Sequence, residues 1–218
     1  MNLEPPTPRK PKPMKVEPKK GEEAEAERGP TGPRVPPGRY RARVVMGDVS
    51  IEESFDVVSN PAARIADSDL EAQNRMTRSA WKMQSATNRL LQTLDSLKAQ
   101  IEDRKSAARS LGKTISETLD SDLKGVLEKI EALSGALAMP ELKDRPAVGE
   151  APRLYEKLSD LLASVGSVNA APTEAQRRYF EELNRESLRL TGEVSSYLAS
   201  LTELNAKLHA EELPVLLW

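Results

Sequence analysis

Apolar side chains recur at intervals of three and four from residue 65 to the end of the chain, the spacing of one α-helical face. No glycine or proline lies between residues 66 and 111, so the first helix is expected to run for about 40 residues, or roughly 60 Å. Ser68 and Glu71 fit a capping box at its start, and Gly112 predicts a bend at its end. Its apolar side chains are Met76, Ala80, Met83, Leu90, Leu94, Leu97 and Ile101.

Three further segments show the same periodicity. They cover residues 115–137, residues 152–166 after a loop rich in proline, and residues 173–208, where Thr173 and Gln176 form a second expected capping box. The last segment carries a sustained heptad-like seam of the kind that antiparallel bundles use. The prediction is therefore a mainly α fold: an antiparallel helical bundle of about four helices.

Residues 38–60 have a different period. Three arginines alternate with apolar side chains before Gly47 and Asp48, and acidic or serine residues alternate with apolar ones after them. A period of two around a Gly-Asp turn predicts a β-hairpin. A lone hairpin is marginally stable in water, so its apolar face needs a cover: the bundle, or strands that precede it in a longer protein. The side chains of that face are Tyr40, Val44, Ile51, Phe55 and Val57.

Residues 1–37 contain ten of the sixteen prolines, together with a lysine-rich run and an acidic run at residues 22–27. Such a segment buries too little apolar surface to offset its chain entropy, so a disordered leader is expected. The expected domains are this leader, the hairpin at 38–60 and the bundle at 65–218. Charge is nearly balanced, with 32 basic and 34 acidic residues, which gives no argument for a nucleic-acid partner. No apolar run has the length of a membrane span.

Residue sets that support catalysis or metal binding are not found in the sequence. There is no cysteine and one histidine, His209, so the usual transition-metal sites and cysteine nucleophiles are excluded. Nucleophile-elbow, phosphate-loop and Glu-x-x-His motifs are missing as well. Adjacent carboxylates are interpreted as solvated charges; they are Glu52 with Glu53, Asp120 with Asp122, Glu181 with Glu182, and Glu211 with Glu212. We therefore expect no catalytic, cofactor-binding or metal residue, no cofactor, and no enzyme activity in this chain by itself.

Two aromatic features lie outside this pattern of charges. Trp81, on the first helix, is interpreted as a core residue, and the alternative is an anchor for a partner. The apolar residues 213–218 are expected to dock onto the bundle.

Four short stretches carry a resemblance to a known family: residues 32–44, 66–73, 153–158 and 171–176. In this order they resemble the C-terminal region of bacterial BNR-repeat, sortilin-like proteins described as glycosyl hydrolases. The resemblance implies that the hairpin is the remnant of an immunoglobulin-like sandwich. It also implies that a β-propeller precedes that sandwich and would hold any active site.

Two functions follow as expectations. The first is a noncatalytic C-terminal structural or interaction region of such a propeller protein, packed on the parent's propeller and sandwich domains. The second is a freestanding coiled-coil-type adaptor that self-associates through the bundle. The first expectation places the chain in the periplasm or outside the cell. A complete chain without a signal peptide would be cytoplasmic.

Overall fold

The computed structural model describes residues 35–60, 65–110, 112, 114–140 and 150–218. The expected disordered leader, residues 1–37, lies outside the described residues except for its last three positions. The elements in chain order are β1 (Gly38–Met46), β2 (Val49–Val57), α1 (Asp67–Ser110), α2 (Glu117–Leu137), α3 (Leu154–Gly166), α4 (Glu174–Ser200) and α5 (Thr202–Ala210). The chain is therefore mainly helical and carries one antiparallel two-stranded hairpin, as the sequence predicted.

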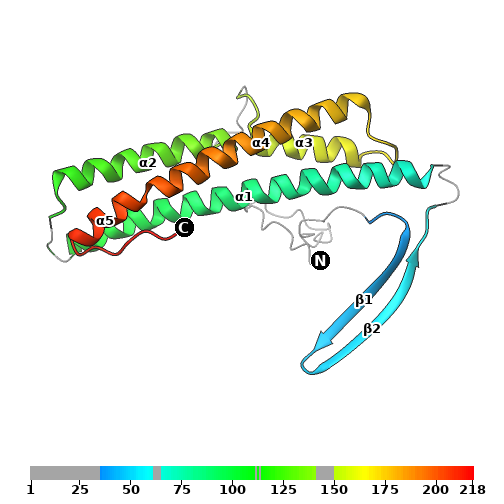
Figure 1. The fold of residues 1–218 in the computed structure, drawn as a ribbon, viewed down its shortest axis with the longest axis horizontal. Coiled ribbons are helices and arrows are strands. Elements are labelled where there is room, and N and C mark those ends of the chain that lie inside the picture. Colours follow the sequence, from blue (N-terminus) through cyan, green and yellow to red (C-terminus); the bar gives the residue numbers. More distant parts are fainter. Residues whose placement is uncertain (1–34, 61–64, 111, 113, 141–149) are drawn as a thin grey trace, which may run out of the picture.

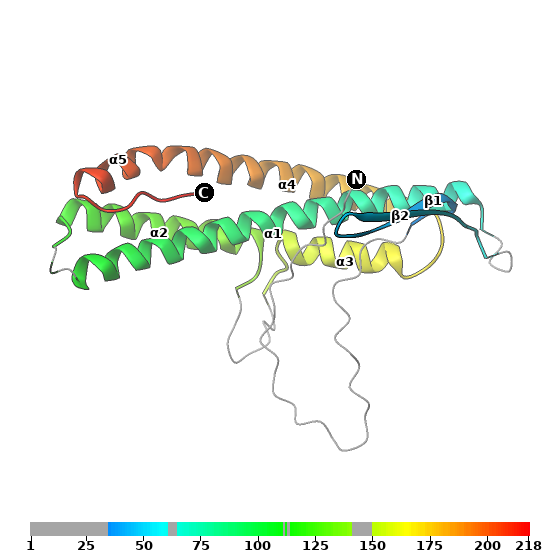
Figure 2. The same cartoon turned by 90° about the horizontal axis from the view of Figure 1, so that it is seen from below.

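The helices form three rods lying side by side, which we call the helical body (Figure 1). α1 is the first rod, α2 and α3 lie end to end along it as the second, and α4 with α5 is the third (Figure 2). The sequence predicted about four helices, whereas the described residues form five because the last predicted segment is divided into α4 and α5; in addition, α2 and α3 share one rod. Length is the reason, because α1 spans about 66 Å whereas α2 and α3 reach only about 32 Å and 20 Å.

The start and end of α1 test the first predicted helix signals. The carbonyl of Ala66 accepts a hydrogen bond from the backbone N–H of Leu70 at 3.3 Å, so the first helical turn closes ahead of Ser68. Ser68 therefore lies inside the first turn, and the capping box predicted from it is wrong. At the other end, the N–H of Gly112 donates to the carbonyl of Arg109 at 3.1 Å, and its φ of 64° reverses the chain. The predicted bend at Gly112 is confirmed.

The second predicted capping box is confirmed. The hydroxyl oxygen of Thr173 accepts from the N–H of Gln176 at 3.2 Å, and the N–H of Thr173 donates to the Gln176 side chain at 2.9 Å. The long seam after it was predicted as one helix but is divided at Leu201, where α4 ends and α5 begins.

One continuous core runs along the helical body. It is built mostly of leucine, and the described residues of α1, α2, α3, α4, α5 and the final segment all contribute to it. Trp81 is 8% exposed and so is buried, in agreement with its interpretation as a core residue. Central members with at most 1% exposure include Leu94, Leu97, Ile101, Leu123, Leu158 and Leu190.

Among the described helices, none combines the length and the apolar character that crossing a bilayer requires.

Candidate functional site

The hairpin β1–β2 has two chemically different faces. Its register places Tyr40 opposite Phe55 and Val44 opposite Ile51, so apolar side chains gather on one face. The rings of Tyr40 and Phe55 stack with their centroids 6.1 Å apart. The Tyr40 hydroxyl donates a 2.6 Å hydrogen bond to the carbonyl of Pro36, which holds the approach to β1 against the hairpin.

The other face of the hairpin is charged. Arg39, Arg41 and Arg43 line β1, and acidic and serine side chains line β2. Arg41 pairs with Glu52 at 2.8 Å, and the Arg43 guanidinium donates to the Ser50 hydroxyl at 2.8 Å. These cross-strand contacts are solvent-exposed, so each adds only a few tenths of a kcal/mol to about 1 kcal/mol of stability.

The apolar face of the hairpin is uncovered. Val44 and Ile51 are each 65% exposed and Phe55 is 49% exposed. In the part of the chain that the structure describes, the two strands contact each other and neither contacts a helix. The hairpin extends away from the helical body beside the N-terminal end of α1 (Figure 1). Of the two covers considered, the described helices of the bundle are therefore ruled out, and strands that precede the hairpin in a longer protein stay a prediction.

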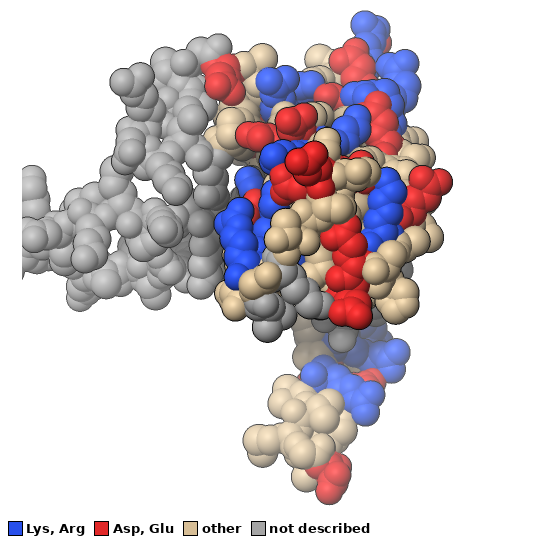
Figure 3. All heavy atoms as spheres, turned by 90° about the vertical axis from the view of Figure 1, so that its left-hand side faces the viewer, with Lys and Arg blue, Asp and Glu red and all other residues tan. Residues whose placement is uncertain are grey.

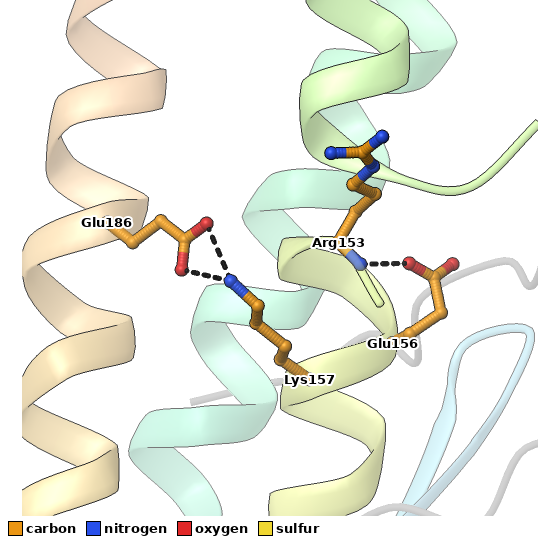
Figure 4. Close-up of polar contacts among 4 residues, drawn as sticks. All are labelled: Arg153, Glu156, Lys157 and Glu186. Carbon is orange, nitrogen blue, oxygen red and sulfur yellow. Dashed lines mark hydrogen bonds and ion pairs between the residues drawn. The ribbon is translucent and has the colours of Figure 1, made fainter. Parts of the chain in front are cut away.

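Polar contacts join the start of α3 to the chain just after α2 and to the middle of α4. Figure 4 shows the contact at the start of α3 and the ion pair between α3 and α4. The Glu156 carboxylate accepts from the N–H of Arg153 and from the N–H of Met139, both at 3.2 Å. Lys157 bridges to both carboxylate oxygens of Glu186 at 2.9 and 3.0 Å. Glu156 thus holds α2 and α3 end to end, and the ion pair ties their rod to α4.

A second set of ion pairs lies where α1, α2 and α5 meet. Lys105, which is 9% exposed, places its ammonium 2.8 Å from the Asp120 carboxylate, and Lys124 approaches the same carboxylate to 2.7 Å. Hydrogen bonds from Lys105 and then Lys124 lower the pKa of Asp120 to about 2, against the opposing effect of desolvation. Lys207 pairs with Asp122 at 2.6 Å, and this contact raises the pKa of Lys207.

The carboxylates of Asp120 and Asp122 therefore pair with different lysines, Asp120 with Lys105 and Lys124 and Asp122 with Lys207. Glu211 is likewise bonded, because it accepts from the Ser116 backbone N–H at 3.2 Å and from the Ser116 hydroxyl. Over the end of the body where these groups lie, acidic and basic side chains are intermixed rather than segregated (Figure 3). The described part of the chain contains no group of three or more histidine, cysteine or acidic side chains placed to hold a metal ion.

The final segment, residues 213–218, lies along the helical body and is held by side chains of α1 and α5. Leu213 and Leu216 are buried, whereas Leu217 and Trp218 are 69% and 48% exposed. The predicted docking of this segment is thus confirmed for two of its apolar side chains. The polar residues that hold it were not identified from the sequence.

Neither a protein-family model, nor a curated protein, nor a solved structure matches this chain.

Proposed function

We propose that this chain is a noncatalytic interaction module, in which the helical body acts as an antiparallel bundle and carries the hairpin as its contact surface. The observation that supports the proposal is the uncovered apolar face of β1 and β2. Val44, Ile51 and Phe55 are each about half exposed or more, and no helix that the structure describes contacts the hairpin. Monomeric proteins rarely leave such a patch in water, and contiguous patches of this kind mark interaction sites.

The proposed occupant of this face is another β-sheet layer of the same parent protein. Two sheets that pack face to face keep apolar residues between them and polar residues outside, and the hairpin has that division of faces. The parent that we propose is a BNR-repeat, sortilin-like propeller protein, in which the hairpin would belong to an immunoglobulin-like sandwich. The support for this parent is the order of the four sequence stretches described above.

Hydrogen exchange tests the proposal without requiring knowledge of the partner. In the chain alone, the amides of β1 and β2 should exchange with little protection, whereas those of the α1 core should be protected by the global stability. In the same protein carrying its preceding sequence, the hairpin amides should gain protection. Equal protection of the hairpin and α1 in the chain alone would contradict the proposal.

A matched pair of variants localises the contact. Phe55→Ser removes an apolar side chain from the uncovered face, and Ser54→Ala changes the neighbouring position on the charged face. In the longer protein, Phe55→Ser should abolish the gain in protection and Ser54→Ala should leave it intact. If both variants behave alike, the apolar face is not the contact.

The alternative is a freestanding adaptor that associates with itself. The same uncovered face supports it, because two copies could cover each other's hairpins. Sedimentation of the chain at increasing concentration separates the alternatives: dimerisation that Phe55→Ser abolishes favours the adaptor. A chain that stays monomeric, or one whose dimers persist in Phe55→Ser, favours the module of a larger protein.

A further inference from the structure

The final segment, residues 213–218, is recognised through its backbone by three side chains. The Asn205 amide accepts from the N–H of Leu216 at 2.7 Å and donates to the carbonyl of the same residue at 3.0 Å. Gln100 forms the same two-way pair with Leu217, with both distances at 2.9 Å. Each side-chain amide therefore contacts the segment as a neighbouring β-strand would.

Arg104 extends this recognition toward the start of the segment. Its guanidinium donates to the carbonyls of Pro214 at 3.3 Å and Val215 at 3.0 Å. Leu213 and Leu216 are 7% and 2% exposed and belong to the core; we call the surface of α1 and α5 that receives the segment the groove. These contacts reach the backbone of the segment and bury two leucines three residues apart, and none of them depends on the segment belonging to the same chain.

The connection between α5 and this segment is short and strained. α5 ends at Ala210, and only Glu211 and Glu212 separate it from Leu213. Glu212 has a φ of 57°, in the left-handed region that glycine and asparagine normally occupy. The sharp reversal is closed by hydrogen bonds from the N–H of Glu212 to His209 and from that of Leu213 to Leu208. A short hinge loop under strain favours exchange of the segment that follows it.

We propose that residues 213–218 exchange between two copies of this chain, so that each copy's segment docks in the groove of the other. Opening the hinge relaxes Glu212, while the contacts of Asn205, Gln100 and Arg104 are remade with the segment of the second copy. The site lies at the opposite end of α1 from the hairpin, so the proposal does not depend on what covers the hairpin (Figure 1).

Cross-linking between two single-cysteine variants tests the exchange directly, because the natural chain contains no cysteine. Ser96 and Trp218 line one shallow hollow beside the docked segment. Ser96→Cys and Trp218→Cys chains are unfolded together, refolded at high concentration and treated with a short, flexible bis-maleimide. The double variant, treated at low concentration, should cross-link within one chain and confirms the reach of the reagent.

Exchange predicts that the two single variants cross-link to each other, with peptides around residues 96 and 218 joined between chains. The proposal is overturned if the refolded mixture stays monomeric in sedimentation, or if its dimers lack this joint peptide. The second result would also identify association through another surface, such as the hairpin.

Two substitutions at the hinge separate strain from charge. Glu212→Gly removes the cost of the left-handed backbone and should weaken dimerisation by about tenfold, since the closed monomer is stabilised. Glu212→Gln removes the charge and keeps the backbone requirement, so its dimerisation should match that of the natural chain. Equal dimerisation of the glycine and glutamine variants would refute the hinge as the cause.

Discussion

Leu158 lies in α3 and is 0% exposed, within the one continuous core of the helical body. Replacing it by alanine removes three carbon atoms, whose transfer from water accounts for about 2.4 kcal/mol. The residual cavity adds to this loss, so we expect Leu158→Ala to lower the free energy of unfolding by about 3–4 kcal/mol. For a chain of this length the corresponding fall in Tm is about 6–16 °C. Leu188→Ala is the matched control, because Leu188 is 66% exposed on α4 and should change stability by less than about 0.5 kcal/mol.

Urea unfolding should be followed at two separate places in the fold. The chain has two tryptophans. Trp81 lies between Gln73 and Gln84, which both bond to α3, and Trp218 lies in the final segment beside Gln100. Trp218→Phe leaves the first as the only reporter, and Trp81→Phe leaves the second. Since the core is continuous, Leu158→Ala should lower the unfolding midpoint equally in both backgrounds, and the far-ultraviolet circular dichroism should follow.

Two results would refute this reasoning. A loss below about 1 kcal/mol, or one equal to that of Leu188→Ala, would mean that Leu158 is not packed as described. A lower midpoint at Trp81 with an unchanged one at Trp218 would mean that the two halves unfold separately, despite the shared rods α1 and α4.

Four further outcomes are expected. Thr173→Ala removes the hydroxyl that caps α4 and should cost about 1 kcal/mol in urea unfolding, whereas glycine at that position should cost only a few tenths. Lys105 holds the carboxylate of Asp120 and lowers its pKa from 3.8 to about 2. The stabilisation of the fold by this carboxylate is therefore complete above pH 3.8 and is lost as the pH falls toward 2. Asp120→Asn should make the Tm less dependent on pH in that window, measured by thermal unfolding. Phe55→Ser should leave the free energy of unfolding of the helical body unchanged, measured by circular dichroism, because the hairpin contacts no described helix. A change above about 0.5 kcal/mol would show a contact. Asn205→Ala removes two hydrogen bonds to the final segment and should lower stability by about 1–3 kcal/mol while increasing the exchange of that segment's amides.

Local patterns were the reliable part of the sequence prediction. The alternation around Gly47 and Asp48 predicted the hairpin because side chains alternate across a strand whatever packs on it. The Thr173 box and the glycine bend at residue 112 were found because caps and turns depend on a few adjacent residues. The Ser68 box failed for the same local reason, since a helix that starts two residues earlier moves the hydroxyl out of the capping position.

Local sequence patterns did not predict the contacts that hold the final segment. Gln100 is an ordinary polar residue in sequence, and its pairing with Leu217 joins α1 to a segment 117 residues further along the chain. Asn205 lies only 11 residues before Leu216, but their pairing requires the chain to reverse after α5. The same holds for Lys105 and Asp120, which belong to different helices and meet only after both have packed. Separation in sequence hides such pairs from any periodicity argument.

The sequence by itself determined the helical and hairpin segments and which face of each is apolar, because hydrophobic period and turn chemistry act over a few residues. Only the tertiary structure decided that α2 and α3 share one rod along α1, that the hairpin's apolar face meets no described helix, and that a strained Glu212 turns the chain into its groove. These outcomes depend on the relative lengths and positions of whole elements, which burial of a common core selects.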